Sequence, residues 1–309
     1  MPFDSQIRIA SPTGASLNAY VREAEGTPRG VVQINHGLAE HAARYARFAD
    51  FLAERGFHAY AHDHRGHGST TAPDAPPRIF AKQGGVAKIL ADIDAVHDRI
   101  AADRPGLPVI LFGHSMGGLA GLNYVLRHSH RLRAAAIWNA NFSAGLLGRV
   151  AQGILALEKF RLGSDVPSRI LPKLTFQAWA KQIPDRRTEF DWLSRDPAEV
   201  DKYVTDPLCG WDASVSMWRD VFDLIFAGAD DRNLAGLRRD LPFNLVGGEK
   251  DPATDGGKAV MHLAGRLQRM GFQDIQASHL TDTRHESLNE VNRDTVMADF
   301  GNWLQRVVG

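Results

Sequence analysis

The sequence predicts an α/β fold: a mostly parallel sheet flanked by helices, with a helical segment inserted into it. Short apolar stretches alternate with stretches of helical periodicity up to residue 139, and this alternation resumes near residue 241. Residues 140–230 contain helical patterns without a convincing strand, and a structureless loop of that length would be unusual. We therefore expect a first core segment (1–139), a helical cap (140–230) and a second core segment (231–309).

The first core segment begins with two stretches that alternate apolar and polar residues, 6–10 and 17–22, around a Ser-Pro-Thr-Gly turn. They predict a β-hairpin at the edge of the sheet. The strands and helices that follow alternate, so this sheet should be doubly wound. We expect the more buried strands at 30–34, 57–61, 107–112 and 133–138, with helices after 45, over 86–100 and after 118.

The predicted cap is rich in aromatic residues and contains four of the six tryptophans of the chain. Trp211 and Trp218 are seven residues apart, as on one face of a helix, where they could form the cap core or a wall of the substrate site. In the second core segment we expect strands at 241–246 and 272–280, and helices over 256–270 and 286–307.

Composition narrows the classes of function. Lys and Arg total 36, as do Asp and Glu, so the net charge is zero and gives no sign of binding to nucleic acid or an anionic membrane surface. One cysteine, Cys209, excludes an intrachain disulfide. The amino terminus resembles no signal peptide, and no apolar run approaches the ~18 residues that span a membrane. We expect a cytoplasmic protein without an integral membrane segment; its oligomeric state is left open.

The stretch Gly113-His114-Ser115-Met116-Gly117-Gly118 lies between a predicted strand and a predicted helix. A G-x-S-x-G turn in that context places the serine at the carboxyl end of the sheet, in a strained conformation that typically has positive φ. Gly113 and Gly117 leave room where a Cβ would collide with neighbouring backbone. These features predict that Ser115 is a nucleophile.

A nucleophilic serine needs a base, and the base needs an acid to orient it. On sheets of this kind the acid follows the nucleophile in the chain and the histidine comes last. Asp251 follows the strand after the insertion, and His285 lies between the last strand and the final helix. The alternatives are Asp255 and Glu249 for the acid, and His279 and His262 for the base.

The developing oxyanion needs hydrogen-bond donors. We expect them to be the backbone N–H of Met116, directly after the nucleophile, and that of Leu38, in the loop after the strand at 30–34. The other residues expected to contact substrate are His36, Gly37, His114, Trp211 and Trp218.

Four histidines lie close together in the sequence, around a strand end and a glycine turn. No second cluster with ligand spacing accompanies them, so we predict a structural role, and we expect neither a metal nor another cofactor. They are His58, His62, His64 and His67.

These motifs resemble the monoacylglycerol lipase and lysophospholipase branch of the α/β-hydrolases. The resemblance implies a cofactor-free serine hydrolase of carboxylic esters, often of one-chain lipids, and it implies the same nucleophile, acid, base and oxyanion donors. The family often has a smaller residue at the position of Leu38, and residues 141–228 match its variable cap only loosely. The matching stretches are 36–41 with Tyr45, 63–68, 113–118, 248–252 and 284–286; residues 206–210 resemble bacterial members of unassigned substrate.

Several activities fit this machinery. The aromatic cap and zero net charge favour neutral one-chain esters, such as monoacylglycerols or alkyl esters of medium length. Lysophospholipid hydrolysis, amide cleavage of the prolyl iminopeptidase type and acyl transfer to an alcohol are alternatives. A binding protein on a hydrolase scaffold is the non-enzymatic alternative, which a missing catalytic residue would favour; none is missing.

Overall fold

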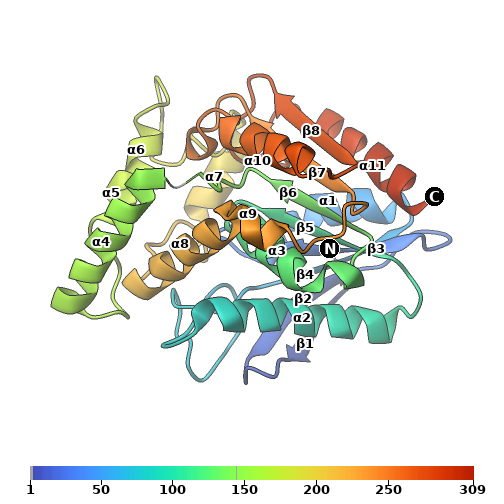
Figure 1. Cartoon of the computed structure of the whole chain (residues 1–309), viewed down its shortest axis with the longest axis horizontal. Coiled ribbons are helices and arrows are strands. Elements are labelled where there is room, and N and C mark those ends of the chain that lie inside the picture. The colour runs from blue at the N-terminus through green and yellow to red at the C-terminus, as the bar shows by residue number, and fades with distance from the viewer. Residues whose placement is uncertain (1–2, 144) are drawn as a thin grey trace.

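The computed structural model describes residues 3–143 and 145–309, which fold around an eight-stranded sheet. The strands are β1 (Ser5–Ala10), β2 (Ser16–Arg22), β3 (Gly30–Asn35), β4 (Phe57–His62), β5 (Val109–His114), β6 (Ala134–Trp138), β7 (Phe243–Gly248) and β8 (Ile275–Leu280). Their order is β1-β2-β4-β3-β5-β6-β7-β8 (Figure 1). Strands β3 to β8 run parallel, whereas β1 and β2 form the predicted antiparallel hairpin at one edge.

Helices cover both faces of the sheet (Figure 1). One face packs against α1 (Ala46–Ala53), which follows the 3₁₀ turn η1 (Ala42–Tyr45), and against α11 (Arg293–Val308). The other face packs against α2 (Gly85–Asp103), α3 (Met116–His128) and α10 (Lys258–Arg269). Every residue of the inner strands β3 to β7 is buried, which explains their nearly continuous apolar sequences.

The expected cap segment lies between β6 and β7, and its regular elements in the described residues are helices and one isolated β-bridge. The helices are α4 (Gly145–Leu162), α5 (Leu171–Leu174), α6 (Phe176–Ala180), α7 (Pro197–Thr205) and α8 (Val215–Ala229); α9 (Asp231–Leu234) leads back to β7. Helices α4 to α6 lie at one end of the molecule, beyond the sheet (Figure 1). Part of the segment has its own small core, formed by Ala180, Ile183, Trp192, Leu193 and Tyr203.

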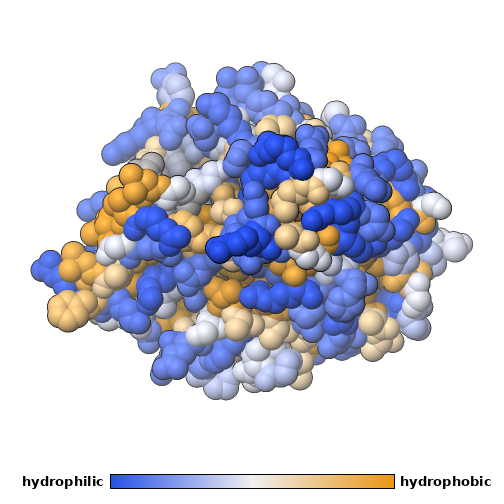
Figure 2. Space-filling view, viewed as in Figure 1, coloured by the Kyte–Doolittle hydropathy of each residue, from blue (hydrophilic) through white to orange (hydrophobic). Residues whose placement is uncertain are grey.

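Hydrophobic side chains gather on the surface of α4. Leu146 is 79% exposed and Phe160 is 89% exposed. Figure 2 shows these apolar surfaces at the left end of the molecule, where α4 and α5 lie. Across residues 3–143 and 145–309, no helix combines the length and apolar character required to traverse a bilayer.

The structure corrects three local expectations. The final helix begins at Arg293 and not at residue 286, because the buried Glu290 carboxylate accepts hydrogen bonds from the backbone N–H groups of Arg195 and Arg284. The last strand begins at Ile275, after a turn that closes α10. Trp211 precedes α8, which starts after its N-cap Ser214, so Trp211 and Trp218 do not share a helix.

Candidate active site

Ser115 occupies a sharp turn between β5 and α3, with φ 54° and ψ −120°. A Cβ on Gly113 would lie 2.3 Å from the backbone oxygen of Gly117, and a Cβ on Gly117 would lie 2.1 Å from the backbone oxygen of Asn35. Both positions therefore require glycine for the turn to be this tight. The positive φ at Ser115 confirms the predicted strained turn.

Ser115, His285 and Asp251 come together from three separate loops. The His285 Nε2 atom is 2.9 Å from Ser115 Oγ, while His285 Nδ1 is 2.9 and 3.0 Å from the two Asp251 oxygens. An ionised carboxylate only accepts hydrogen bonds, so His285 Nδ1 carries the proton and Nε2 can accept the one on the Ser115 hydroxyl. The arrangement can transfer a proton from serine to histidine.

The Asp251 side chain is fully buried and held from several sides. Its oxygens accept hydrogen bonds from Ala253 N at 2.9 Å, Thr254 Oγ1 at 2.7 Å and Asn139 Nδ2 at 3.1 Å. Burial raises the pKa of Asp251, but the interaction with His285 and the hydrogen bonds from the Thr254 and Asn139 side chains outweigh it, so that the pKa lies below its ordinary value. Asp251 therefore stays an anion beside His285.

The four alternative residues lie outside this cluster. Asp255 is exposed and lies beside Lys258, and the exposed Glu249 accepts a hydrogen bond from Asp282 N. His279 contacts the backbone oxygen of Gly256, while His262 is exposed on α10.

The expected oxyanion donors border the same space. Leu38 and Met116 both line the cavity above Ser115. A Cβ built on Gly37 would lie 3.4 Å from Ser115 Cβ, so the loop after β3 approaches the serine closely. Among the described residues, neither the Leu38 nor the Met116 N–H has an acceptor in the protein, which leaves both able to bind an oxyanion.

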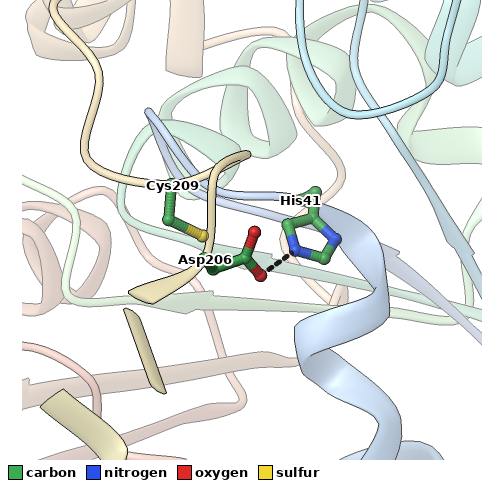
Figure 3. Close-up of side chains that lie close together, drawn as sticks. All are labelled: His41, Asp206 and Cys209. Carbon is green, nitrogen blue, oxygen red and sulfur yellow. Dashed lines mark hydrogen bonds and ion pairs between the residues drawn. The ribbon is translucent and has the colours of Figure 1, made fainter. Parts of the chain in front are cut away.

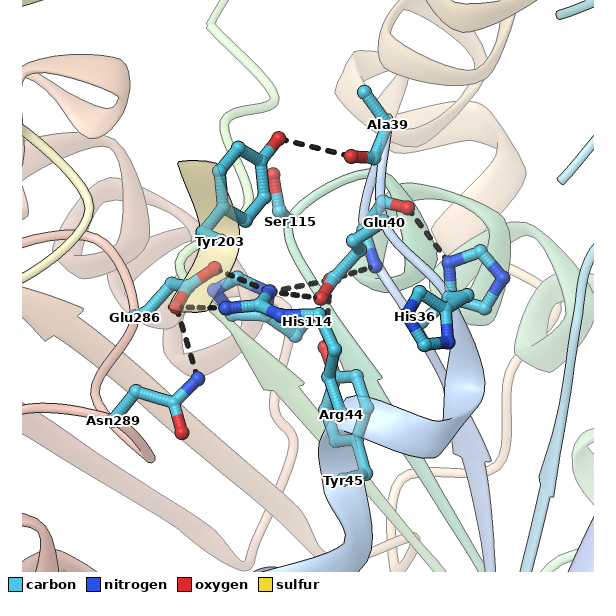
Figure 4. A network of polar contacts seen from close by, with 12 residues as sticks. His36, Ala39, Glu40, Arg44, Tyr45, His114, Ser115, Tyr203, Glu286 and Asn289 are labelled. Atoms are coloured by element: carbon cyan, nitrogen blue, oxygen red, sulfur yellow. Dashed lines mark hydrogen bonds and ion pairs between the residues drawn. The ribbon is translucent and has the colours of Figure 1, made fainter. Parts of the chain in front are cut away.

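A buried charge network joins the loop after β3 to the loop that carries His285 (Figure 4). Glu40 Oε1 accepts from Gly37 N at 2.5 Å and from the Tyr45 hydroxyl at 2.9 Å. Arg44 Nη1 bridges Glu40 Oε2 at 2.5 Å and Glu286 Oε1 at 2.6 Å. Burial raises the pKa of Glu40, but the Arg44 and His114 charges hold it well below its ordinary value. Glu40 is thus an ionised acceptor that orients the Gly37–Leu38 backbone.

His114 connects this network to the nucleophile turn. Its Nε2 is 3.0 Å from the backbone oxygen of His285, and its Nδ1 is 3.6 Å from Glu40 Oε1. Because a carbonyl only accepts, Nε2 must donate. Burial lowers the pKa of His114, but Glu40 and Glu286 outweigh it, so the net shift is upward.

Several of these residues were not singled out as site residues in the sequence. Glu40 and Glu286 lie within the motifs that carry the family resemblance, so the sequence could have pointed to them. No sequence pattern indicates that Asn139 bonds to Asp251. Likewise, no pattern indicates that Trp192 packs against His285, although their ring centroids are 5.0 Å apart.

A cavity of about 660 Å³ opens above Ser115. Gly37, His114 and Trp218 line it, and their contact with substrate stays a prediction. Val150 and Leu174, which are 53% exposed, border its opening near α4 and α5. The apolar wall comes largely from the expected cap segment and includes Ile154, Leu171, Phe176, Trp218, Val221 and Phe222.

Two residues that were expected to contact substrate do not line this cavity in the described residues. His36 is fully buried and absent from the described cavity lining; its Nε2 accepts from His64 N at 2.9 Å, which makes it a support of the loop. Trp211 borders a second groove, with its ring centroid 4.8 Å from that of His67. The unwound segment before α8 turns Trp211 away from the cavity that Trp218 lines.

Three of the four clustered histidines pack together with His36. Neighbouring ring centroids are 4.4 Å apart for His36 and His64 and 4.7 Å apart for His62 and His64. Burial lowers the pKa of His36 and His67 to about 3 and that of His62 to about 4, so these rings are neutral. His58 lies apart, 2.8 Å from Glu23.

Comparison with known proteins identifies the family. The model of the family described as "Serine aminopeptidase, S33" matches residues 26–292. The monoacylglycerol lipase of Mycolicibacterium smegmatis is 28% identical, covering 97% of this chain and 96% of the relative. The monoglyceride lipase of Homo sapiens is 26% identical, covering 99% and 92%.

A carboxyl esterase from Bacillus coagulans, solved in complex with glycerol, has a similar fold, with a TM-score of 0.89, 21% identity and 99% coverage of both chains. The chain therefore belongs to the serine aminopeptidase S33 family and is an ester hydrolase of the α/β-hydrolase fold, similar to monoacylglycerol lipases.

Proposed function

We propose that the protein is a serine carboxylic-ester hydrolase that works through an acyl-enzyme. Ser115 attacks the acyl carbonyl while His285 accepts its proton, and Asp251 holds the imidazole in the required tautomer. His285 then gives the proton to the departing alcohol, and water hydrolyses the acyl-enzyme through the same base. The observation that carries the proposal is the 2.9 Å contact of Ser115 Oγ with His285 Nε2, with Asp251 on the opposite nitrogen.

Oxyanion stabilisation falls to the backbone N–H groups of Leu38 and Met116, which border the cavity and have no other described acceptor. Met116 is the first residue of α3, so the helix dipole adds positive potential there. Glu40 and His114 serve as positioning residues, since they contact the loops and not the reacting atoms.

The proposed substrate is a neutral ester with one acyl chain, such as a monoacylglycerol. Residues 140–230 act as the cap in this proposal, because they supply most of the apolar wall above Ser115. Each CH₂ buried there contributes roughly 0.8 kcal/mol. The lipase relatives and the glycerol in the esterase complex support the same class.

Amide cleavage is the second candidate, because the family description names an aminopeptidase and two carboxylates, Glu40 and Glu286, line the cavity base. Such carboxylates could bind an α-amino group. Here both are bonded to the Arg44 guanidinium, which compensates their charge. The ester is therefore favoured.

A fluorophosphonate probe tests the nucleophile. We expect labelling of the native chain, no labelling of Ser115→Ala, and retained labelling of Ser143→Ala, which changes another serine of the cavity wall. Labelling that survives in Ser115→Ala would contradict the assignment.

Substrate class is tested by kcat/KM across acyl chains on one alcohol, and then across monoacylglycerol, lysophospholipid and aminoacyl amide. A rise with chain length followed by a plateau is expected, with monoacylglycerol preferred. Preference for acetyl esters, lysophospholipids or amides would overturn the substrate proposal.

A further inference from the structure

A second group of reactive side chains lies where the cap segment meets the loop after β3. His41, Asp206 and Cys209 point toward one another in Figure 3. We propose that these three residues bind one Zn²⁺ ion, which fastens the cap to the loop that carries Leu38.

The donor set suits zinc. An imidazole, a carboxylate and a thiolate are its common protein ligands, and three of them leave a fourth position for water. One ligand atom from each residue lies within 4.8 Å of the others, and His41 Nε2 is 2.8 Å from Asp206 Oδ2. Ligands of a tetrahedral zinc are roughly 3–4 Å apart. The hydrogen-bonded His41 and Asp206 atoms must therefore move slightly apart to admit the ion, whereas a ligand pair near the 4.8 Å limit must close by about 1 Å.

The two backbone segments that carry the three residues are already in contact. His41 precedes η1, whereas Asp206 and Cys209 lie in the turn between α7 and α8. Across this junction, Gly210 N donates to the backbone oxygen of Ala39 at 3.0 Å, and the Tyr203 hydroxyl donates to the same oxygen at 2.9 Å. Side-chain rotation can therefore complete the site without moving the cap.

Zinc binding must displace protons from two of the three ligands. Zinc binding must break the S–H bond of Cys209, form a Zn–S bond and release that proton to solvent. The proton on His41 Nε2, which the Asp206 carboxylate accepts, must move to Nδ1 so that Nε2 can bind the ion. The Asp206 carboxylate attracts a dication, whereas the charge of the nearby Glu40 is already compensated by Arg44.

A zinc ion here would hold residues 206–209 against His41, which lies three residues after Leu38 in the same loop. We expect ester turnover to slow when Zn²⁺ binds. This consequence rests on the proposed function, whereas the binding itself does not.

Cadmium titration tests the site on the purified full chain. A thiolate–cadmium charge-transfer band in the ultraviolet can report only Cys209, because the chain has no other cysteine. We expect a band that saturates at one equivalent and is displaced by Zn²⁺. The band should vanish in Cys209→Ser, whose folding is checked by its melting temperature.

Variants of the other two ligands separate a built site from a lone thiol. His41→Gln and Asp206→Asn should each weaken cadmium binding at least about tenfold, a loss typical even of outer-shell changes. The matched control His130→Gln, at an exposed histidine, should bind as the native chain does.

No band at micromolar cadmium would overturn the proposal. So would equal binding by the native chain, His41→Gln and Asp206→Asn, which would mean adventitious thiol binding only. A chain that binds cadmium in this pattern but hydrolyses no ester would overturn the proposed function and support the metal site.

Discussion

The Nε2 atom of His114 lies 3.0 Å from the backbone oxygen of His285, so the residue before Ser115 holds the loop that carries the proposed base. The other nitrogen of the same ring faces Glu40, whose carboxylate binds the N–H of Gly37. One buried imidazole therefore sets the relative positions of three loops that meet at Ser115.

Asp251→Asn should fold but lose about 10⁴-fold in kcat, because the amide favours the wrong imidazole tautomer. The measurement is ester turnover with a melting curve for each protein. Asp255→Asn is the matched control, since Asp255 is exposed and outside the cluster around His285. Impairment of the control alone would move the acid to Asp255.

Glu40→Gln should lower kcat by about 10- to 100-fold with little change in KM, because the Gly37 N–H loses its charged acceptor and Leu38 moves relative to the oxyanion. Removing one partner of a buried ion pair also destabilises, by about 3–5 kcal/mol, which urea unfolding measures. Glu54→Gln, at an exposed glutamate 3.6 Å from Arg55, is the control. A rise in KM at constant kcat would contradict a positioning role.

Trp218→Ala should reduce kcat/KM for long acyl chains about tenfold and barely affect short ones, because Trp218 forms part of the cavity wall. Trp211→Ala should keep the native dependence on chain length, since Trp211 borders the other groove. The comparison needs two esters that differ only in chain length. Equal loss in both variants would place Trp211 at the substrate after all.

The raised pKa of Asp220 predicts that the stability of the protein depends on pH. Burial, together with the charge of Asp223, raises the pKa of this carboxyl on α8 to about 7. Its contribution to stability is full below the unfolded pKa, near 3.8, and is lost as pH rises through about 7. The resulting fall in the free energy of unfolding is about 4 kcal/mol at most, because each unit of pKa difference corresponds to about 1.4 kcal/mol.

Asp220→Asn cannot ionise, so it should be more stable than the native chain at about pH 8 and nearly equal at about pH 4. Urea unfolding at several pH values measures the difference, with Asp212→Asn, an exposed neighbour, as the control. A pH-independent difference between Asp220→Asn and the native chain would refute the assignment.

The parts of the fold set by local sequence could be predicted. The β5–Ser115–α3 turn depends on an apolar strand and two glycines within five residues, and the order of strands then placed Asp251 and His285. Residues 286–292 resembled the start of a helix, but buried hydrogen bonds to Glu290 favour turns there.

Contacts between loops that are far apart in the sequence leave no pattern in the local sequence. The Asn139 amide meets Asp251, and Trp192 packs on His285, only because the strands and the cap bring these loops together. For the same reason helical spacing misplaced Trp211, since it cannot show that a loop turns away before α8 begins.

Main-chain hydrogen bonds join the cap to the loop that carries His285. The backbone oxygens of Trp192 and Leu193 accept hydrogen bonds from the N–H groups of His285 and Glu286, at 3.4 and 2.7 Å. Arg284 adds bonds to the backbone oxygens of Asp191 and Ser194. Coupling between two sites is reciprocal. A ligand that loosens residues 191–194 should therefore speed amide exchange at His285 and Glu286, whose N–H groups donate to those residues. An inhibitor that needs His285 held in place must weaken that ligand by the same free energy by which the ligand weakens the inhibitor.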